Sequence, residues 1–189
     1  MKNLTTLLLT TIFIATFGFG QPTMTIATTL EITPEVTTFA GSGSTGSADG
    51  TGTAASFYKP SGVAVDGSGN VYVAEYYNHL IRKITSAGVV TTLAGSGSAG
   101  SANGTGTAAS FYRPNDVAVD GSGNVYVADK SNHLIRKITS AGVVTTLAGS
   151  GSAGSANGTG TAASFTLPYG VAVDASGNVY VADSGNNLI

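Results

Sequence analysis

The chain has 189 residues, of which only 8 are Lys or Arg and 10 are Asp or Glu. A net charge of −2 gives no basic field for phosphates, so nucleic-acid binding is not expected. The lack of Cys excludes a disulfide framework, thiolate metal sites and a Cys nucleophile, and two His are too few for a multi-His metal cage. Hydrophobic residues make up 42% of the chain, which is enough to build a core.

The N-terminal segment has the order of a secretory signal peptide. Lys2 supplies a positive charge, the stretch 4–19 is apolar apart from Thr and small residues, and small residues precede a cleavage position before Gln21. A membrane anchor is the alternative, but the apolar run is short for a bilayer and no basic cluster follows it. We predict a signal peptide over 1–20, a Thr/Pro-rich leader over 21–34 and no membrane span after cleavage. The protein would then be secreted, periplasmic or on the cell surface.

A repeat of 54 residues dominates the rest of the chain. Phe57, Phe111 and Phe165 recur at this interval (111 − 57 and 165 − 111). The segment 78–111 is identical, residue for residue, to the segment 132–165. Each repeat must therefore be interpreted as one supersecondary unit that packs on its neighbours.

Within one repeat, four short stretches have the character of strands, being apolar and rich in β-branched residues. In the second repeat they are 117–120, 124–129, 134–138 and 143–148. The segment Asp-Gly-Ser-Gly-Asn at 120–124 predicts a tight turn, because Gly and Asn tolerate a positive φ. Neither face of the first two strands is clearly polar, so both faces are expected to be covered. Four antiparallel strands covered by the next unit describe a blade of an all-β propeller.

The repeats contain a recognisable triplet. Residues 78–80 and 132–134 both read Asn-His-Leu, with Gly-Asn-Val-Tyr-Val-Ala before them and Leu-Ile-Arg-Lys-Ile overlapping them. From about residue 35 to residue 189 the sequence resembles bacterial proteins of the NHL-repeat family, which is named after this triplet. The third copy departs from the pattern, since Asn187 replaces the His. The resemblance implies a β-propeller of four-stranded NHL-type blades.

The number of blades predicted is too small for a closed propeller, which carries about 4 to 8. Full blades are expected over about 60–94 and 114–148, with a partial blade over 168–189. We therefore expect a fragment that forms an open partial ring of about two and a half blades. Uncovered blade faces would promote self-association.

Two patterns resemble ligand sites but are better explained as turns and loops. The segment 41–46 matches G-x-G-x-x-G, yet no helix follows it to hold a phosphate. The segment 66–70 begins like a calcium loop, but Tyr77 stands where a bidentate Glu is required. We predict a surface loop and a hairpin turn, and assign no cofactor or metal site.

The His and Arg residues of the repeat are also expected to be structural. His79 and His133 are equivalent, and Asn187 replaces them in the third copy, which favours a hydrogen-bonding role over a catalytic base or metal ligand. The pairs Arg-Lys at 82–83 and 136–137 lie within a strand, so their two charges point to opposite sides. We expect these cations to pair with acidic residues of a neighbouring blade.

The three copies differ mainly in two windows, one before the first strand and one in the turn between the second and third strands. Because the first two strands are antiparallel, both windows lie on one face of the propeller, where rigid strands present variable loops. Sequence drift at exposed positions is the alternative explanation. The candidate binding residues on this face are Tyr58, Lys59, Glu75, Tyr76, Tyr77, Tyr112, Arg113, Asn115, Asp116, Lys130 and Tyr169.

These features predict a secreted or cell-surface propeller that acts as a binding or structural scaffold for a protein, peptide or glycan. The alternative is a fragment of a propeller enzyme, a lyase or hydrolase, whose catalytic residues lie in further C-terminal blades. A non-functional fragment is a third interpretation. No catalytic residue is assigned within the 189 residues, so an enzyme is the less favoured class.

Overall fold

The computed structural model describes residues 2–7 and 33–189, which form two units that divide between Phe39 and Ala40. In the first unit, strand β1 (Lys2–Leu7) pairs antiparallel with β2 (Thr33–Thr38). Most of the predicted signal peptide and leader lies outside the described residues. Within the described part of the chain, no helix has the length and apolar character to cross a membrane.

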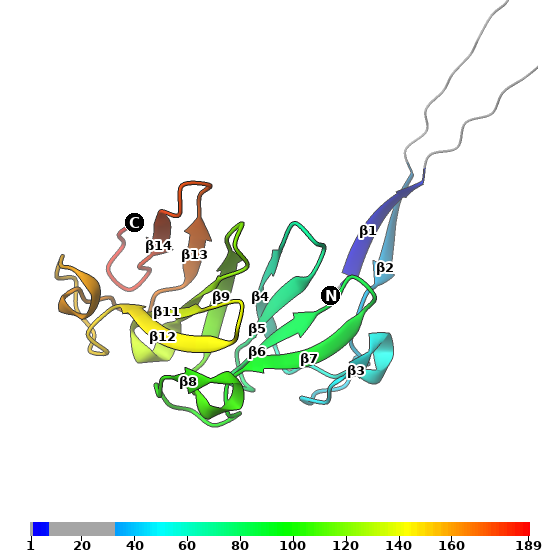
Figure 1. Ribbon diagram of the computed structural model, residues 1–189, viewed down its shortest axis with the longest axis horizontal. Helices are drawn as coiled ribbons and strands as arrows, with labels where there is room; N and C mark the ends of the chain where they lie inside the picture. The colour runs from blue at the N-terminus through cyan, green and yellow to red at the C-terminus, as the bar shows by residue number, and fades with distance from the viewer. Residues whose placement is uncertain (1, 8–32) are drawn as a thin grey trace, which may run out of the picture. The chain divides into compact units, whose positions relative to one another are not determined.

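The second unit is built from one antiparallel sheet per repeat (Figure 1). The first sheet contains β4 (Pro60–Val65), β5 (Val71–Glu75), β6 (Leu80–Ile84), β7 (Val89–Ala94) and the short β3 (Gly50–Thr51). The second contains β9 (Pro114–Val119), β10 (Val125–Asp129), β11 (Leu134–Ile138), β12 (Val143–Ala148) and β8 (Gly104–Thr105). The third contains β13 (Gly170–Val173) and β14 (Val179–Ala182). Single 3-10 turns are η1 (Gly52–Ala54), η2 (Gly106–Ala108), η3 (Lys130–Asn132) and η4 (Gly160–Ala162).

The predicted all-β propeller fold is confirmed, with one addition to each full blade. Four strands pair in sequence order, and the first strands β4, β9 and β13 of successive sheets lie side by side (Figure 1). The loop that precedes each full blade adds a fifth strand of two residues, which pairs with the outer strand of that blade. A two-residue strand is too short to show an alternating pattern, so it could not be predicted from the sequence.

The turn between the first two strands of a blade is closed by its own Asp. In the second blade, Asp120 Oδ1 accepts hydrogen bonds from the backbone N–H groups of Ser122 and Asn124, each at 2.9 Å. Asp120 Oδ2 accepts from Asn124 Nδ2 at 2.8 Å and from the Tyr126 hydroxyl at 3.1 Å. Burial opposes ionisation, but these hydrogen bonds lower the pKa of Asp120 overall. The predicted hairpin turn is therefore an Asx-type turn that uses both carboxylate oxygens.

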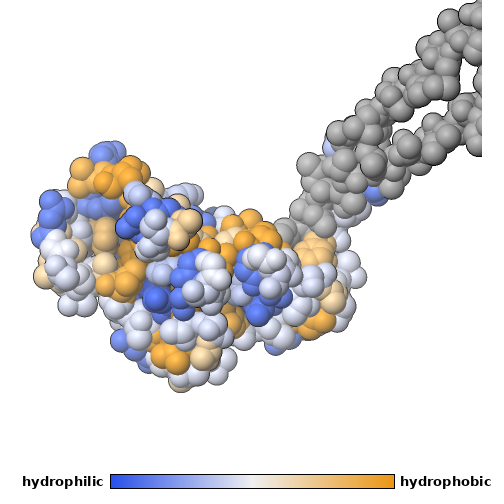
Figure 2. Space-filling model, turned by 45° about the horizontal axis from the view of Figure 1, so that its top comes forward, coloured by the Kyte–Doolittle hydropathy of each residue, from blue (hydrophilic) through white to orange (hydrophobic). Residues whose placement is uncertain are grey.

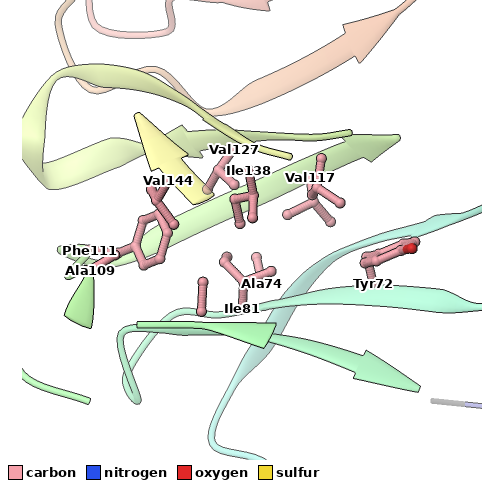
Figure 3. Close-up of a cluster of buried hydrophobic side chains, with 11 residues drawn as sticks. Tyr72, Ala74, Ile81, Ala109, Phe111, Val117, Val127, Ile138 and Val144 are labelled. Atoms are coloured by element: carbon pink, nitrogen blue, oxygen red, sulfur yellow. The ribbon is translucent and has the colours of Figure 1, made fainter. Parts of the chain in front are cut away.

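The hydrophobic core lies between the sheets. Val117, Val127 and Ile138 of the second blade face Ala74 and Ile81 of the first (Figure 3). Phe111, at the end of the loop before the second blade, is fully buried in the same cluster. A second cluster joins the second and third sheets. Each sheet is thus buried by its neighbours, which explains why its strands have no polar face.

Burial at equivalent positions depends on the presence of a neighbouring blade. Val117 of β9 is only 3% exposed, because the first blade packs against it. Its equivalent in β4, Val63, is 53% exposed, and the nearby Val65 is 61% exposed. Apolar residues accordingly gather in patches on the surface of the blades (orange in Figure 2). Such exposed apolar surface favours association with another protein surface.

A buried Arg joins the third strand of each full blade to the loop that precedes the blade. Arg136 is fully buried, and its Nη1 donates to Asp129 Oδ2 at 3.0 Å. Its Nη2 donates to the carbonyl of Ala102 at 3.1 Å and to Asn103 Oδ1 at 2.8 Å. The guanidinium also lies over the Phe111 ring, with its Cζ 5.4 Å from the ring centroid. Burial raises the pKa of the Asp129 carboxyl to about 6, against the lowering effect of its hydrogen bonds and of Arg136.

The first blade repeats this arrangement with one more charge. Arg82 Nη1 pairs with Glu75 at 2.5 Å, and its Nη2 pairs with Asp49 at 2.7 Å. The opposite orientation of Arg82 and Lys83 is confirmed, since Arg82 is fully buried and Lys83 is not. The expectation that these cations pair with a neighbouring blade is wrong. The acidic partner lies on the adjacent strand of the same sheet, where antiparallel pairing places its side chain on the same face.

Replacing Arg136 with Met should strongly destabilise the protein, because the substitution leaves the Asp129 carboxylate buried without its cation. We expect a loss of about 3 to 5 kcal/mol in the free energy of unfolding, measured by urea denaturation. Lys137→Met is the control, because Lys137 is only half-buried over Tyr126, and it should cost less than about 1 kcal/mol. The double variant Arg136→Met/Asp129→Leu should recover part of the loss. A midpoint for Arg136→Met equal to that of wild type would contradict this role.

The 189-residue chain should self-associate in solution through its uncovered blade faces, because Val63 and Val65 are exposed, whereas Val117 is buried and Val119 half-buried at the equivalent positions. Multi-angle light scattering should give a mass above that of the monomer. The double variant Val63→Ser/Val65→Ser should shift the population toward monomer. A wild-type chain that stays monomeric across the concentration range would show that this face does not mediate self-association.

Candidate functional site

The Asn-His-Leu triplet lies between the second and third strands. Its side chains hydrogen-bond this turn to the preceding loop and to the next blade. Its Asn joins the turn to the preceding loop: Asn132 Nδ2 donates to Asp129 Oδ2 at 2.8 Å and to the Gly100 carbonyl at 2.7 Å. The same pair of bonds is made by Asn78 and Asn186 in the other copies. The Leu of the triplet is buried in the first two copies. The Asn and Leu of the triplet therefore stabilise the turn and anchor it to the preceding loop.

The His of the triplet bonds each blade to the next. His79 Nδ1 accepts a hydrogen bond from the Arg113 backbone N–H at 3.0 Å, and His133 Nδ1 accepts from the Leu167 N–H at 3.1 Å. The expected structural role of these His residues is confirmed. Both have a left-handed backbone (φ 57° and 56°), and Asn187 in the third copy adopts the same conformation at φ 59°. Asn tolerates this conformation well, which explains the exchange.

The bond made by His79 requires an unprotonated Nδ1. Burial, together with the nearby positive charge of Arg113, lowers the pKa of His79 below its usual value. The neutral ring is thus favoured in the folded protein. Protonation of Nδ1 would remove the acceptor of the Arg113 N–H at the contact between the first two blades.

The variable windows bring five tyrosines together on one surface. Tyr58 and Tyr77 have ring centroids 4.9 Å apart, and Tyr76 meets Tyr77 edge to face at 5.0 Å. Tyr58 and Tyr77 are each 41% exposed, and Tyr169 is 52% exposed. We call Tyr58, Tyr76, Tyr77, Tyr112 and Tyr169 the tyrosine surface.

Three cations of the variable windows gather around one of these rings. Lys59 Nζ, Lys130 Nζ and Arg113 Cζ lie 5.2, 5.5 and 5.7 Å from the centroid of the Tyr76 ring. Lys130 also lies 4.8 Å from the ring of Tyr169, in the third repeat. The contacts therefore connect residues of all three repeats into one cluster.

The remaining predicted residues are not on this surface. Glu75 is fully buried, where it pairs with Arg82 and accepts the Tyr58 N–H, so it cannot contact a ligand. Asn115 is buried and its Nδ2 donates to the Tyr169 carbonyl at 2.7 Å. Asp116 is half-buried, and its Oδ2 accepts the Val171 N–H at 3.0 Å. Asn115 and Asp116 therefore connect the second blade to the third, whereas Glu75 makes its contacts within the first blade.

The link between the buried Arg and the loop was not predicted from the sequence. The pairing of each buried Arg with the adjacent strand did have a signal, because an acidic residue stands seven positions before it, at 75 and 82 and at 129 and 136. Within the described residues, no three His, Asp or Glu side chains come close enough together to hold a metal ion. The tyrosine surface with its three cations draws on every repeat and is partly exposed to solvent.

Removing the His79 imidazole should change how stability depends on pH. The folded-state pKa of His79 is lowered, so its contribution is fully present above about pH 6.5 and is lost as pH falls through the folded-state pKa. The free energy of unfolding of wild type minus that of His79→Asn should therefore decrease between pH 7.5 and pH 5, measured by urea denaturation. Asn already occupies this position in the third copy and adopts the same backbone. A difference that is constant with pH would contradict the proposed acceptor role of Nδ1.

Comparisons with known proteins agree with this architecture. The sequence model described as NHL repeat matches residues 57–84, 111–138 and 165–189. The NHL repeat-containing protein 3 of Mus musculus is 32% identical over 117 residues, covering 60% of this chain and 31% of that protein. The chloroplastic protein SUPPRESSOR OF QUENCHING 1 of Arabidopsis thaliana is 37% identical over 94 residues, covering 49% of this chain and 9% of that protein. The chain thus spans a third or less of the length of these relatives.

Solved structures also resemble this chain in fold. A protein of unknown function from Bacteroides thetaiotaomicron is 29% identical with a TM-score of 0.59, covering 63% of this chain and 31% of that one. An auxiliary nutrient binding protein from Bacteroides ovatus is 25% identical with a TM-score of 0.55, covering 62% and 33%. The residues matched by the NHL repeat model contain both Asn-His-Leu turns, Arg82 and Arg136, and the first three strands of each full blade. The chain therefore carries NHL repeats, folded as blades of a β-propeller.

Proposed function

We propose that the chain is a binding module and that its ligand, a protein, peptide or glycan, contacts the tyrosine surface. The observation that carries this proposal is the convergence of exposed tyrosines and cations from three repeats on one surface. Tyr and Arg are the residues that most often supply binding energy at protein surfaces, since each combines a large apolar area with a polar group.

The rest of the blade supports this role by holding the surface rigid. The turn that carries Tyr76 and Tyr77 is fixed by Asn78, and the segment that carries Tyr112 and Arg113 is fixed by His79. Tyr58 and Tyr112 are also fixed, because their backbone N–H groups donate to the buried Glu75 and Asp129. Rigid presentation lowers the entropy lost when a ligand binds.

The location of the protein is part of the proposal. The Bacteroides ovatus relative is described as a nutrient-binding protein, which supports a binding role and is compatible with secretion to the periplasm or the cell surface. The apolar N-terminal segment of the sequence supports the same location.

An enzymatic function has less support in this chain. A gluconolactonase from Xanthomonas campestris shares the fold, at 15% identity and a TM-score of 0.51, and such similarity concerns the fold alone. The two His residues, which a lyase or hydrolase would need as bases or ligands, instead accept backbone hydrogen bonds on Nδ1.

The proposal is tested by screening the labelled full-length chain on a glycan array and a peptide array. We expect binding to members of one array, and we expect Tyr77→Ala to weaken it by roughly thirtyfold, the effect of losing one aromatic hot spot. Tyr180→Ala is the matched control. Tyr180 is 52% exposed but bonds to Asp174 at the opposite end of the strands, so its loss should leave binding unchanged. Two empty arrays would refute the binding function, and full binding by Tyr77→Ala would refute the role of this surface.

A further inference from the structure

The tyrosine surface carries a concentration of positive charge that the protein itself does not neutralise. Lys59, Arg113 and Lys130 come from three separate segments and surround the Tyr76 ring. In the part of the chain that the structure describes, the salt bridges involve Arg82 and Arg136 and none of these three cations. Three positive charges around one ring repel one another, and an anion bound among them would remove that repulsion.

None of the acidic side chains near this cluster in sequence forms a salt bridge with its cations within the described residues. Asp116, three positions after Arg113, is half-buried, and its Oδ2 instead accepts the Val171 N–H. Glu75 and Asp129 immediately precede Tyr76 and Lys130, yet both are fully buried and already paired with Arg82 and Arg136. Cation–π contact attracts each cation to the ring face without changing the total charge. In a protein with a net charge of −2, this cluster is a local exception that points to a negatively charged ligand.

Two of the three cationic residues have a defined backbone conformation in the protein without a ligand. Lys59 and Arg113 have left-handed φ angles of 53° and 55°, and the Arg113 N–H is bonded to His79. Leu167 has the same conformation at the equivalent place in the third repeat, with a φ of 53°. The conformation therefore belongs to the repeat, whereas the positive charge is specific to the first two copies.

Exposed aromatic rings flank the cations on either side. Tyr58 and Tyr77 contact one another beside Lys59, and Tyr169 lies against Lys130. Such rings offer flat apolar faces on which the C–H face of a sugar ring can stack, and hydroxyl groups that can bond to its polar edge. The surface thus combines stacking platforms with one central anion-binding position.

Among polyanions, this arrangement fits an acidic polysaccharide better than a peptide or a nucleic acid. The surface is formed by turns and strand ends, so it offers no strand edge to which an extended peptide could add. A nucleic acid carries a phosphate on every unit and needs cations distributed along its backbone, whereas the three cations here gather at one ring. We infer that the ligand is a polyuronate, whose carboxylate binds among Lys59, Arg113 and Lys130 while its sugar rings stack on the neighbouring tyrosines. This inference rests on the proposed binding function.

The inference is tested by calorimetric titration of the full chain with four probes. They are oligogalacturonate, its fully methyl-esterified form, poly-glutamate and oligo-deoxythymidylate. The ester retains the sugar backbone and removes the charge, so we expect it to bind at least about tenfold more weakly than the acid. Lys130→Gln should weaken oligogalacturonate binding by about tenfold. Lys137→Gln is the matched control, since Lys137 also lies 5.5 Å from a tyrosine ring but on strand β11.

The outcomes separately test the need for an anion, the class of ligand and the role of the cation cluster. Equal affinity for the acid and its ester overturns the requirement for an anion and leaves the binding function intact. Tighter binding of poly-glutamate or of the oligonucleotide overturns the polysaccharide in favour of that class. Equal losses for Lys130→Gln and Lys137→Gln overturn the cation cluster as the site. If none of the four probes binds, the polyuronate inference fails, and the glycan and peptide arrays separately decide whether the chain binds any ligand.

Discussion

The fold of each blade depends on a guanidinium buried between a sheet and the loop before it. Arg136 lies on strand β11, yet it bonds to carbonyl and amide oxygens of Ala102 and Asn103 and pairs with Asp129 on strand β10. A buried cation is costly unless its hydrogen-bonding groups are satisfied. The loop is rich in Gly and Ser and has few apolar groups to bury. These hydrogen bonds therefore hold it against the sheet, together with the buried Phe111 at its end.

The carboxylate of Asp129 connects this network to the segment before the blade. Its Oδ2 accepts hydrogen bonds from Arg136 and Asn132, and its Oδ1 accepts the Tyr112 N–H. The buried interior of the blade is thereby connected to the segment that carries the exposed tyrosines. The arrangement fixes the surface through short bonds to a rigid sheet, which is how repeat scaffolds present variable side chains.

Contacts between blades combine apolar packing with a few directional hydrogen bonds. The sheets pack through apolar side chains, which fit any neighbour of similar shape. The register between them is set by directional hydrogen bonds, which His79 and Asp116 accept and Asn115 donates. Apolar packing supplies most of the energy, and the polar bonds select one orientation. Because the blades are so similar in sequence, the same interface can recur along the chain.

The sequence alone determined the all-β class, the repeat length, the strands and the asparagine-bearing hairpin turns, because alternation, turn residues and repetition are local properties. It also identified the windows in which Tyr58, Lys59, Tyr76, Tyr77, Arg113, Lys130 and Tyr169 vary. Only the tertiary structure separated these residues from Glu75, Asn115 and Asp116, which stand in the same windows but are wholly or partly buried. The direction in which a side chain points at the end of a strand depends on bulges and on neighbouring blades, and the register shifts beside Asp129 and Glu75 are of this kind. The loop partners of each buried Arg were decided in the same way, because Ala102 and Asn103 lie 34 and 33 positions before Arg136 and no local pattern encodes such a contact.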